Sequence, residues 1–166
     1  MSKLIINGQE ATFTPGQTIL EAARNNGIEI PTLCFLADTI PTGVCRVCVV
    51  EVAGVDRLLP ACDTPANEGM EVSTDTDSVR ASRKMNLEML MATGEHSCPA
   101  CAAAGDCRLQ DLAYEYQVDT VTLPRGREFP KDDSNTFIIR DYSKCVLCGR
   151  CIAACNEIQV NLAIPY

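Results

Sequence analysis

Short runs that alternate apolar and polar residues open the chain, and they predict β-strands. Lys3–Ile6 and Glu10–Phe13 alternate on either side of an Asn-Gly pair, which favours a two-residue hairpin turn. Val47–Val52 is a β-branched run with two distinct faces, and Arg57–Leu59 can pair with it across a glycine turn. The pattern therefore predicts two pairs of strands in the first part of the chain.

A short helix is predicted between these two pairs. Thr18 and Glu21 stand three residues apart, as in a capping box, and Gly27 can adopt the left-handed conformation that ends a helix. The order strand, strand, helix, strand, strand over roughly the first half of the chain predicts a small α+β roll.

A longer helical pattern runs over residues 75–93, and Gly94 ends it. Three basic residues lie between its apolar positions, and we expect them to form a solvated face: Arg80, Arg83 and Lys84.

Regular structure becomes sparser after this helix. Cys107–Tyr116 is predicted to form a second short helix with Cys107 at its N-terminus, where the helix dipole favours a thiolate. Leu123–Ser134 is polar and contains prolines and a glycine, so it is interpreted as a connector. Thr136–Ile139 is predicted to be a short strand.

Composition limits the kind of protein. The chain has 166 residues with 46% hydrophobic content, but only 5% are aromatic and Trp is absent, which suits a small core supported by metal. A net charge of −8 argues against a nucleic-acid partner. The N-terminus has no secretory pattern, and no run reaches the roughly 18 apolar residues of a membrane span. We therefore expect a cytoplasmic protein with reduced thiols and no disulfide framework.

Eleven cysteines and the single histidine fall into three sets of four. Thiolate-rich sets of this kind select iron–sulfur clusters, zinc or copper(I). The first set is Cys34, Cys45, Cys48 and Cys62; the second is His96, Cys98, Cys101 and Cys107; the third is Cys145, Cys148, Cys151 and Cys155.

The third set has the most specific spacing. Its Cys-x2-Cys-x2-Cys-x3-Cys order is that of bacterial ferredoxins, which predicts a [4Fe–4S] cluster on Cys145, Cys148 and Cys151. The fourth cysteine of such a run ligates a different cluster, so Cys155 is expected to serve a further cluster or to remain a thiol. Asn156 follows it, where ferredoxins have proline.

The other two sets leave two kinds of metal open. A gap of ten residues after Cys34 departs from the plant-type [2Fe–2S] spacing, and four thiolates also suit a structural zinc ion. His96 lies two residues before Cys98, and one imidazole with three thiolates suits either a [4Fe–4S] cluster or zinc.

The order of the three sets resembles the N-terminal iron–sulfur region of a known family. That family comprises the large iron–sulfur subunit of complex I, NAD(P)-linked [FeFe]-hydrogenase and formate dehydrogenase alpha subunits, and the diaphorase small subunit of NAD-reducing hydrogenases. The resemblance is carried by IPTLCFL (Ile30–Leu36), TGVCRVCVVEV (Thr42–Val52), EHSCPACAAAGDCRLQDLA (Glu95–Ala113) and CVLCGRCIAACNEIQ (Cys145–Gln159).

The resemblance implies an α+β chain with three cluster-binding parts. These are a β-grasp [2Fe–2S] domain over residues 1–76, a small helical [4Fe–4S] domain with one His and three Cys ligands over 77–118, a connector over 119–135, and an incomplete bacterial-ferredoxin-like [4Fe–4S] segment over 136–166. One residue separates His96 from Cys98, whereas many members have three. Relatives continue into a second cysteine-rich run, so the chain is expected to be a shortened subunit or the N-terminal part of a longer one, and to hold its third cluster weakly when it is alone.

The expected function is electron transfer in a hetero-oligomer. The chain would relay electrons between a flavin/NAD(P)H-binding subunit and a second redox subunit, of hydrogenase or formate dehydrogenase type, and would carry no substrate chemistry itself. One alternative is the N-terminal part of the catalytic subunit of an NAD(P)-linked hydrogenase or formate dehydrogenase. The other is a zinc-stapled interaction module.

Overall fold

The computed structural model describes residues 2–124 and 131–164. The chain divides into two compact units, the first formed by Met1–Arg83 with Gly149–Tyr166 and the second by Lys84–Cys148. Residues 125–130 of the predicted connector lie outside the described residues.

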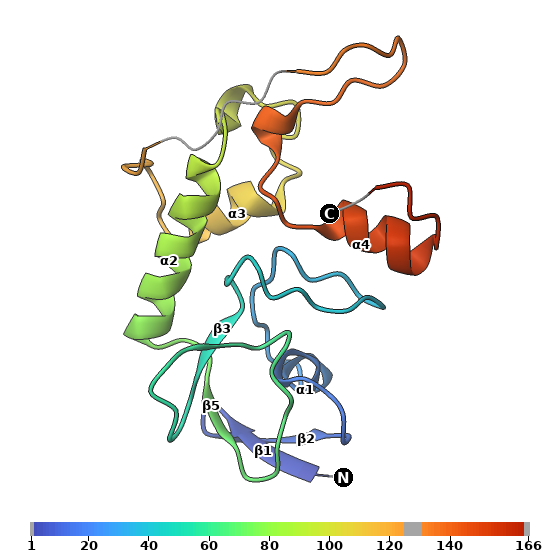
Figure 1. Ribbon diagram of the computed structural model, residues 1–166. Helices are drawn as coiled ribbons and strands as arrows, with labels where there is room; N and C mark the ends of the chain where they lie inside the picture. Colours follow the sequence, from blue (N-terminus) through green and yellow to red (C-terminus); the bar gives the residue numbers. More distant parts are fainter. Residues whose placement is uncertain (1, 125–130, 165–166) are drawn as a thin grey trace. The chain divides into compact units, whose positions relative to one another are not determined.

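The first unit contains a five-stranded mixed sheet (Figure 1). Its strands are β1 (Ser2–Ile6), β2 (Gln9–Phe13), β3 (Val49–Val52), β4 (Leu59–Pro60) and β5 (Glu71–Ser73). They lie in the order β2-β1-β5-β3-β4, with β1 and β5 parallel and the other neighbours antiparallel. The mixed α+β class expected from the sequence is confirmed.

The predicted hairpin forms β1 and β2. Asn7 and Gly8 both have positive φ angles, 51° and 78°, as a two-residue turn between twisted strands requires. Leu4 and Ile6 of β1 are buried while Lys3 and Ile5 are exposed or nearly so, which is the alternation expected for a strand with one covered face.

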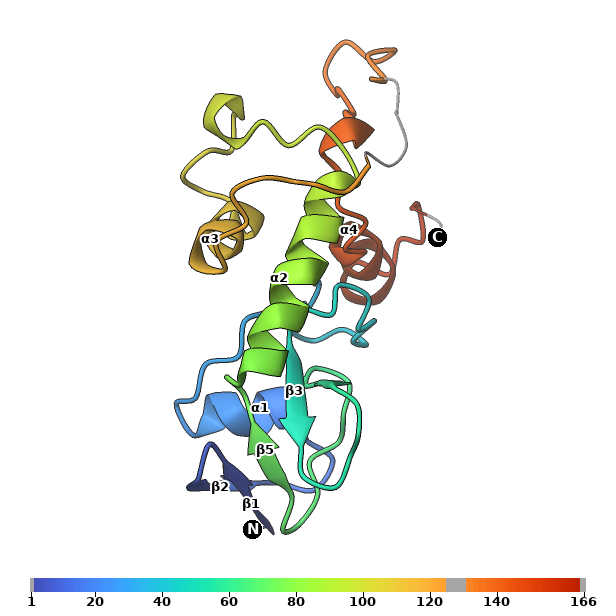
Figure 2. The same ribbon diagram turned by 90° about the vertical axis from the view of Figure 1, so that its left-hand side faces the viewer.

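Helix α1 (Ile19–Asn25) begins at the predicted capping box. The Thr18 hydroxyl accepts from the Glu21 N–H at 3.3 Å, and the Glu21 carboxylate accepts from the Thr18 N–H at 2.7 Å. Gly27, with φ 73°, follows the end of the helix. Buried residues of α1 share one hydrophobic core with those of the sheet, so the helix covers a face of the sheet (Figure 2).

The prediction of four strands was incomplete. Strand β5 is the central strand that links the two pairs, and its pairing joins β1 to β3. It is only three residues long with one buried side chain, Val72, which is too short for an alternating pattern to be recognised.

Helix α2 (Asp77–Ala92) confirms the predicted long helix but corrects the assignment of its basic residues. Arg83 is only 2% exposed, because it lies on the same stripe of the helix as buried Val79 and Leu87. Its Nη2 donates a 2.8 Å hydrogen bond to the carbonyl oxygen of Val49 in β3. The expectation of a solvated Arg83 was therefore wrong, whereas Arg80 is exposed and paired with Asp75 at 2.8 Å.

The second unit is mostly irregular. It contains the end of α2, a 3₁₀ turn η1 (Cys98–Ala100), helix α3 (Arg108–Glu115) and a 3₁₀ turn η2 (Tyr142–Lys144). The predicted strand at Thr136–Ile139 is absent from this described segment. The side-chain oxygen of Asn135 instead accepts from the N–H groups of Phe137 and Ile138, at 2.8 and 3.1 Å, and only an isolated bridge joins Asp132 to Arg140.

The C-terminal part of the chain returns to the first unit. Helix α4 (Arg150–Ala153) continues into a π-helical turn, η3 (Ala154–Ile158). Among the described residues, every helix is too short or too polar to cross a membrane.

Candidate iron–sulfur sites

The four cysteines of the first set are all buried in the first unit. Cys34 lies in the loop after α1, Cys45 and Cys48 lie just before β3, and Cys62 follows β4. Their exposed fractions are 7%, 4%, 2% and 0%. Loops of the roll therefore bring thiols from distant parts of the sequence into a dry environment.

These thiols form two hydrogen-bonded pairs. The Cys45 thiol donates to the sulfur of Cys34 and lowers the pKa of Cys34 to about 5, against the opposing effect of burial. The Cys62 thiol donates to the sulfur of Cys48 in the same way and lowers the pKa of Cys48 to about 7. The pKa values of Cys45 and Cys62 are raised, first by these donated bonds and then by burial.

Backbone N–H groups also point at these sulfurs. Those of Val44 and Cys45 bond to Cys34, and those of Ala61 and Cys62 bond to Cys48. Arg46 has a left-handed φ of 53°, which turns the chain sharply between Cys45 and Cys48. Donors of this kind stabilise negative sulfur, so the set fits a group that is bound through thiolates.

The second set lies in the second unit, around η1 and the start of α3. Cys98 begins η1, Cys101 ends it with a 3.2 Å bond from its N–H to the Cys98 carbonyl, and Cys107 is the residue that caps α3, as predicted. Gly105 lies between Cys101 and Cys107, and its N–H donates a 2.8 Å hydrogen bond to the side-chain oxygen of buried Gln110 in α3, which fixes this loop.

His96 has the feature expected of a ligand. It is partly buried, and its Nε2 atom is buried without a hydrogen-bond partner among the described residues. The pKa of His96 is lowered, first by burial and then by the charge of Lys144. A buried nitrogen that is neutral and unpartnered costs free energy unless something binds it, so this atom fits a metal group.

The third set is divided between the units. Cys145 and Cys148 belong to the second, and Cys151 and Cys155 belong to the first. Leu147 and Gly149 have positive φ angles of 53° and 74°, which bend the chain tightly around Cys148. Cys151 is exposed on α4, and Cys155 lies partly buried in η3.

The positions of these side chains can also be compared with the requirements of a site for a single metal ion. In the part of the chain that the structure describes, no three His, Cys, Asp or Glu side chains are placed to hold a single metal ion.

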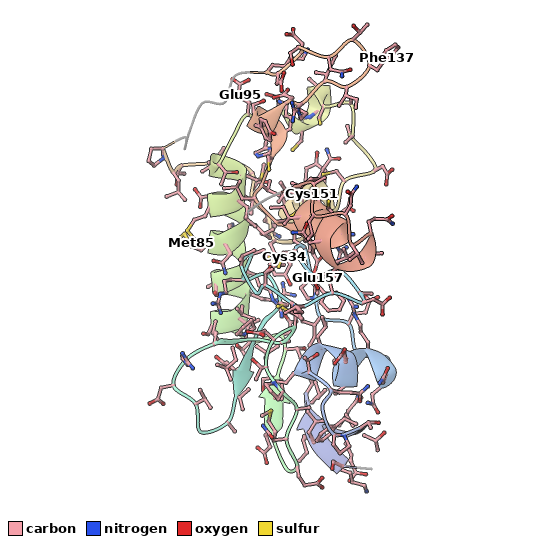
Figure 3. The ribbon with its side chains drawn as sticks, turned by 45° about the vertical axis from the view of Figure 1, so that its right-hand side comes forward. Cys34, Met85, Glu95, Phe137, Cys151 and Glu157 are labelled. Carbon is pink, nitrogen blue, oxygen red and sulfur yellow. The ribbon has the colours of Figure 1, made fainter. Side chains whose placement is uncertain are left out.

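Three residues near these sets were not recognised as important from the sequence. Gly94 was assigned only as a helix end, yet a Cβ there would lie 2.0 Å from the Ser143 carbonyl oxygen. Glycine is also found where two backbone segments approach closely, and this is the sequence signal that Gly94 offered. The side chains of Lys144 and Glu157 form hydrogen bonds with the backbone of Glu95 and Ile40, which lie far away in the sequence, and no sequence signal indicates such bonds. Glu157 is labelled in Figure 3, together with Cys34 of the same unit.

Two family descriptions match the chain. Residues 2–77 match the "2Fe-2S iron-sulfur cluster binding domain", and residues 83–122 match the "NADH-ubiquinone oxidoreductase-G iron-sulfur binding region". The first match contains the first set of cysteines, and the second contains His96 and its three cysteines.

Named relatives match almost the whole chain. It is 36% identical over 173 residues to the alpha subunit of the NADPH-Fe(3+) oxidoreductase of Geobacter sulfurreducens, covering 96% of this chain and 20% of that protein. It is 35% identical over 153 residues to the gamma subunit of the NAD-reducing hydrogenase HoxS of Cupriavidus necator, covering 90% of this chain and 64% of that protein. The chain therefore spans about a fifth of the first relative and about two thirds of the second.

A solved structure shares both the fold and the sequence pattern. A chain of the crystal structure of an NAD+-reducing [NiFe]-hydrogenase in the H2-reduced state matches with a TM-score of 0.90 and 35% identity, over 99% of this chain and 69% of that chain. Together with the two family matches, this shows that the chain belongs to the family of iron–sulfur proteins that includes the large iron–sulfur subunit of complex I, subunits of NAD-reducing hydrogenases and the alpha subunit of NADPH-Fe(3+) oxidoreductase.

Proposed function

We propose that the chain is the iron–sulfur electron-transfer part of an NAD(P)-linked oxidoreductase complex. The observation that carries the proposal is the buried set of Cys34, Cys45, Cys48 and Cys62. In this set the sulfurs of Cys34 and Cys48 accept hydrogen bonds from the other two thiols and from backbone N–H groups. Family membership supports it, because the relatives are named as subunits of hydrogenases and NAD(P)H oxidoreductases. The chain itself would not carry substrate chemistry.

The ligands are proposed set by set. Bound clusters would supply reversible one-electron chemistry at each set. We assign a [2Fe–2S] cluster to Cys34, Cys45, Cys48 and Cys62, a first [4Fe–4S] cluster to His96, Cys98, Cys101 and Cys107, a second [4Fe–4S] cluster to Cys145, Cys148 and Cys151, and a further cluster to Cys155.

The domain boundaries follow this assignment. We propose a β-grasp domain over residues 1–76, a His/Cys-ligated domain over 77–118, a connector over 119–135 and a ferredoxin-like segment over 136–166. The support for the first boundary is that the sheet ends at Ser73 and α2 begins at Asp77.

The residues around each set give it a distinct electrostatic character. Burial of the first set excludes water, and the backbone N–H groups that bond to Cys34 and Cys48 offset negative charge on the thiolates. In the second set, the neutral imidazole of His96 replaces one thiolate and removes one negative charge, which raises the reduction potential of the site.

The proposed partners follow from the family. One is a flavin/NAD(P)H-binding subunit, and the other is a second redox subunit of hydrogenase or formate dehydrogenase type, in a hetero-oligomer without nucleic acid. A cytoplasmic location suits the many free cysteines, because that compartment keeps thiols reduced.

The test is the metal and sulfide content of the protein purified without oxygen. Iron and acid-labile sulfide in near-equal amounts, with EPR signals of both [2Fe–2S] and [4Fe–4S] clusters after reduction, are expected. A colourless protein that holds zinc and no sulfide would overturn the proposal and would favour the zinc-stapled module instead.

A further inference from the structure

Two segments of the second unit are joined by their backbones beside His96 and Cys145. The N–H of Glu95 donates to the carbonyl oxygen of Ser143 at 2.9 Å, and the Thr93 hydroxyl approaches the carbonyl oxygen of Cys145 at 3.4 Å. The close approach depends on Gly94, since any Cβ at that position would overlap the Ser143 carbonyl. One contact therefore joins the start of the second ligand set to the start of the third.

Lys144 places a positive charge in this contact. It immediately precedes Cys145, and its Nζ donates to the carbonyl oxygen of Glu95, the residue before His96. Its charge acts on the His96 ring and also on the Asp141 carboxylate, which accepts from the N–H of Ser143 at 3.0 Å. The ammonium thus lies beside the residue that precedes His96, while Lys144 itself is the chain neighbour of Cys145. The Asp141 carboxylate nearby offsets part of its effect.

We propose that Lys144 sets the reduction potentials of the two [4Fe–4S] clusters together, from a single position between their ligand segments. This rests on the proposed function. Reduction adds one electron and makes a cluster more negative, so a nearby cation stabilises the reduced form and raises the potential. A charge shared by two clusters shifts both in the same direction, and the driving force for electron transfer between them changes little.

The size of the effect follows from exposure. Lys144 is exposed to solvent, so its charge is partly screened by water and salt. We expect its removal to change the ratio of reduced to oxidised cluster at a fixed ambient potential by roughly three- to tenfold, where tenfold corresponds to about 59 mV for a one-electron couple. The change should shrink as ionic strength rises, which a purely structural effect would not do.

The experiment is an EPR-monitored redox titration of the full chain, with dithionite as the electron donor. Lys144→Gln should lower both [4Fe–4S] potentials. Lys144→Arg should leave both at their wild-type values, because it keeps the positive charge. Lys84→Gln is the control, since Lys84 is also an exposed lysine of the second unit. Normal cluster signals in Lys144→Gln with both potentials unmoved would overturn the inference alone.

A second variant is needed in case Lys144→Gln fails to bind its clusters, since its potentials could not then be measured. Asp141→Asn removes the neighbouring negative charge while its side-chain oxygen can still accept from Ser143. Both potentials should rise in this variant, and no rise would overturn the inference. Absence of [4Fe–4S] signals from the reduced wild-type chain would overturn the proposed function itself, and the inference with it.

Discussion

The carboxylate of Glu157 accepts a 2.6 Å hydrogen bond from the backbone N–H of Ile40, a residue 117 positions earlier in the chain. Glu157 lies in η3, just beyond Cys155, and Ile40 lies in the loop that separates Cys34 from Cys45. The bond therefore attaches the C-terminal helical segment to a loop of the proposed [2Fe–2S] site, within one unit. Hydrogen bonds to charged groups are stronger than neutral ones, so this bond can hold an otherwise irregular loop.

Replacing Glu157 should loosen that loop. In Glu157→Ala the Ile40 amide loses its acceptor, and its free energy of opening should fall by about 0.5–1.5 kcal/mol, because the bond is exposed to water; the measurement is hydrogen exchange of the Ile40 amide. Glu157→Gln should lose less, because the amide oxygen can still accept. Glu29→Ala, at an exposed position of the same unit, is the control. Unchanged exchange of Ile40 in Glu157→Ala would contradict the role of this bond.

The buried guanidinium of Arg83 should stabilise the first unit. Arg83→Ala removes its 2.8 Å bond to the Val49 carbonyl, leaves that oxygen without this donor and empties the space of the side chain. We expect a loss of about 2–3 kcal/mol in the free energy of unfolding, measured by urea denaturation. Arg80→Ala, three residues earlier and exposed, should cost no more than about 1 kcal/mol. Equal effects of the two substitutions would show that the burial of Arg83 is unimportant.

These cases show which parts of the fold the sequence predicts. The β1–β2 hairpin and α1 were predicted because their signals are local, an Asn-Gly turn and a capping box within a few residues. Strand β5 was missed because its pairing with β1 joins residues 66 positions apart, as in the pair Ile6 and Val72, and leaves no periodic pattern. Arg83 was wrongly predicted to be exposed because the prediction used its charge and ignored its position on the buried face of α2, between Val79 and Leu87.

The same distinction applies to the sites. Spacing in the sequence was enough to propose three ligand sets, and their assignment to clusters stays a prediction. The predicted position of Cys107 at the start of α3 was correct. The bonds of Glu157 to Ile40 and of Lys144 to Glu95 could not be predicted, because each joins a side chain to a distant backbone atom. Backbone acceptors and donors carry no residue-specific signal.

Gly94 should tolerate no larger residue. In Gly94→Ala the new Cβ would lie 2.0 Å from the Ser143 carbonyl oxygen and 2.9 Å from its carbon, so one of the two backbone segments must move. We expect a loss of about 1–3 kcal/mol in the unfolding free energy, together with faster exchange of the Glu95 amide. Ser97→Ala, at an exposed position nearby, is the control. Wild-type stability and wild-type exchange in Gly94→Ala would contradict the close approach.

His96 can be tested by changing the charge of its ligand set. His96→Cys should retain the [4Fe–4S] cluster proposed for the second set but lower its potential, because a thiolate adds a negative charge where the neutral imidazole had none. The buried, unpartnered Nε2 atom supports this role. The measurement is an EPR-monitored redox titration, with His96→Ala as a comparison that should lose the cluster. An unchanged spectrum and potential in His96→Cys would show that His96 is not a ligand.

Cys155 provides the sharpest test of the third set. In the bacterial ferredoxin run the fourth cysteine ligates a different cluster from the first three, so Cys155 should not belong with Cys145, Cys148 and Cys151. The structure places Cys151 on α4, where it is exposed, and Cys155 in the π-helical turn that follows, where it is partly buried. The two thiols thus occupy different environments although only three residues separate them.

Serine substitutions at these two positions should give opposite results. Cys155→Ser should leave the EPR signals of both [4Fe–4S] clusters and the iron content per chain as in the wild type. Cys151→Ser, the matched control, should abolish the signal assigned to the third set, because it removes one of the three thiolates proposed to ligate that cluster. If Cys155→Ser loses the same signal and the same amount of iron as Cys151→Ser, then Cys155 ligates the same cluster as Cys151, and the expectation drawn from the ferredoxin run is wrong for this chain.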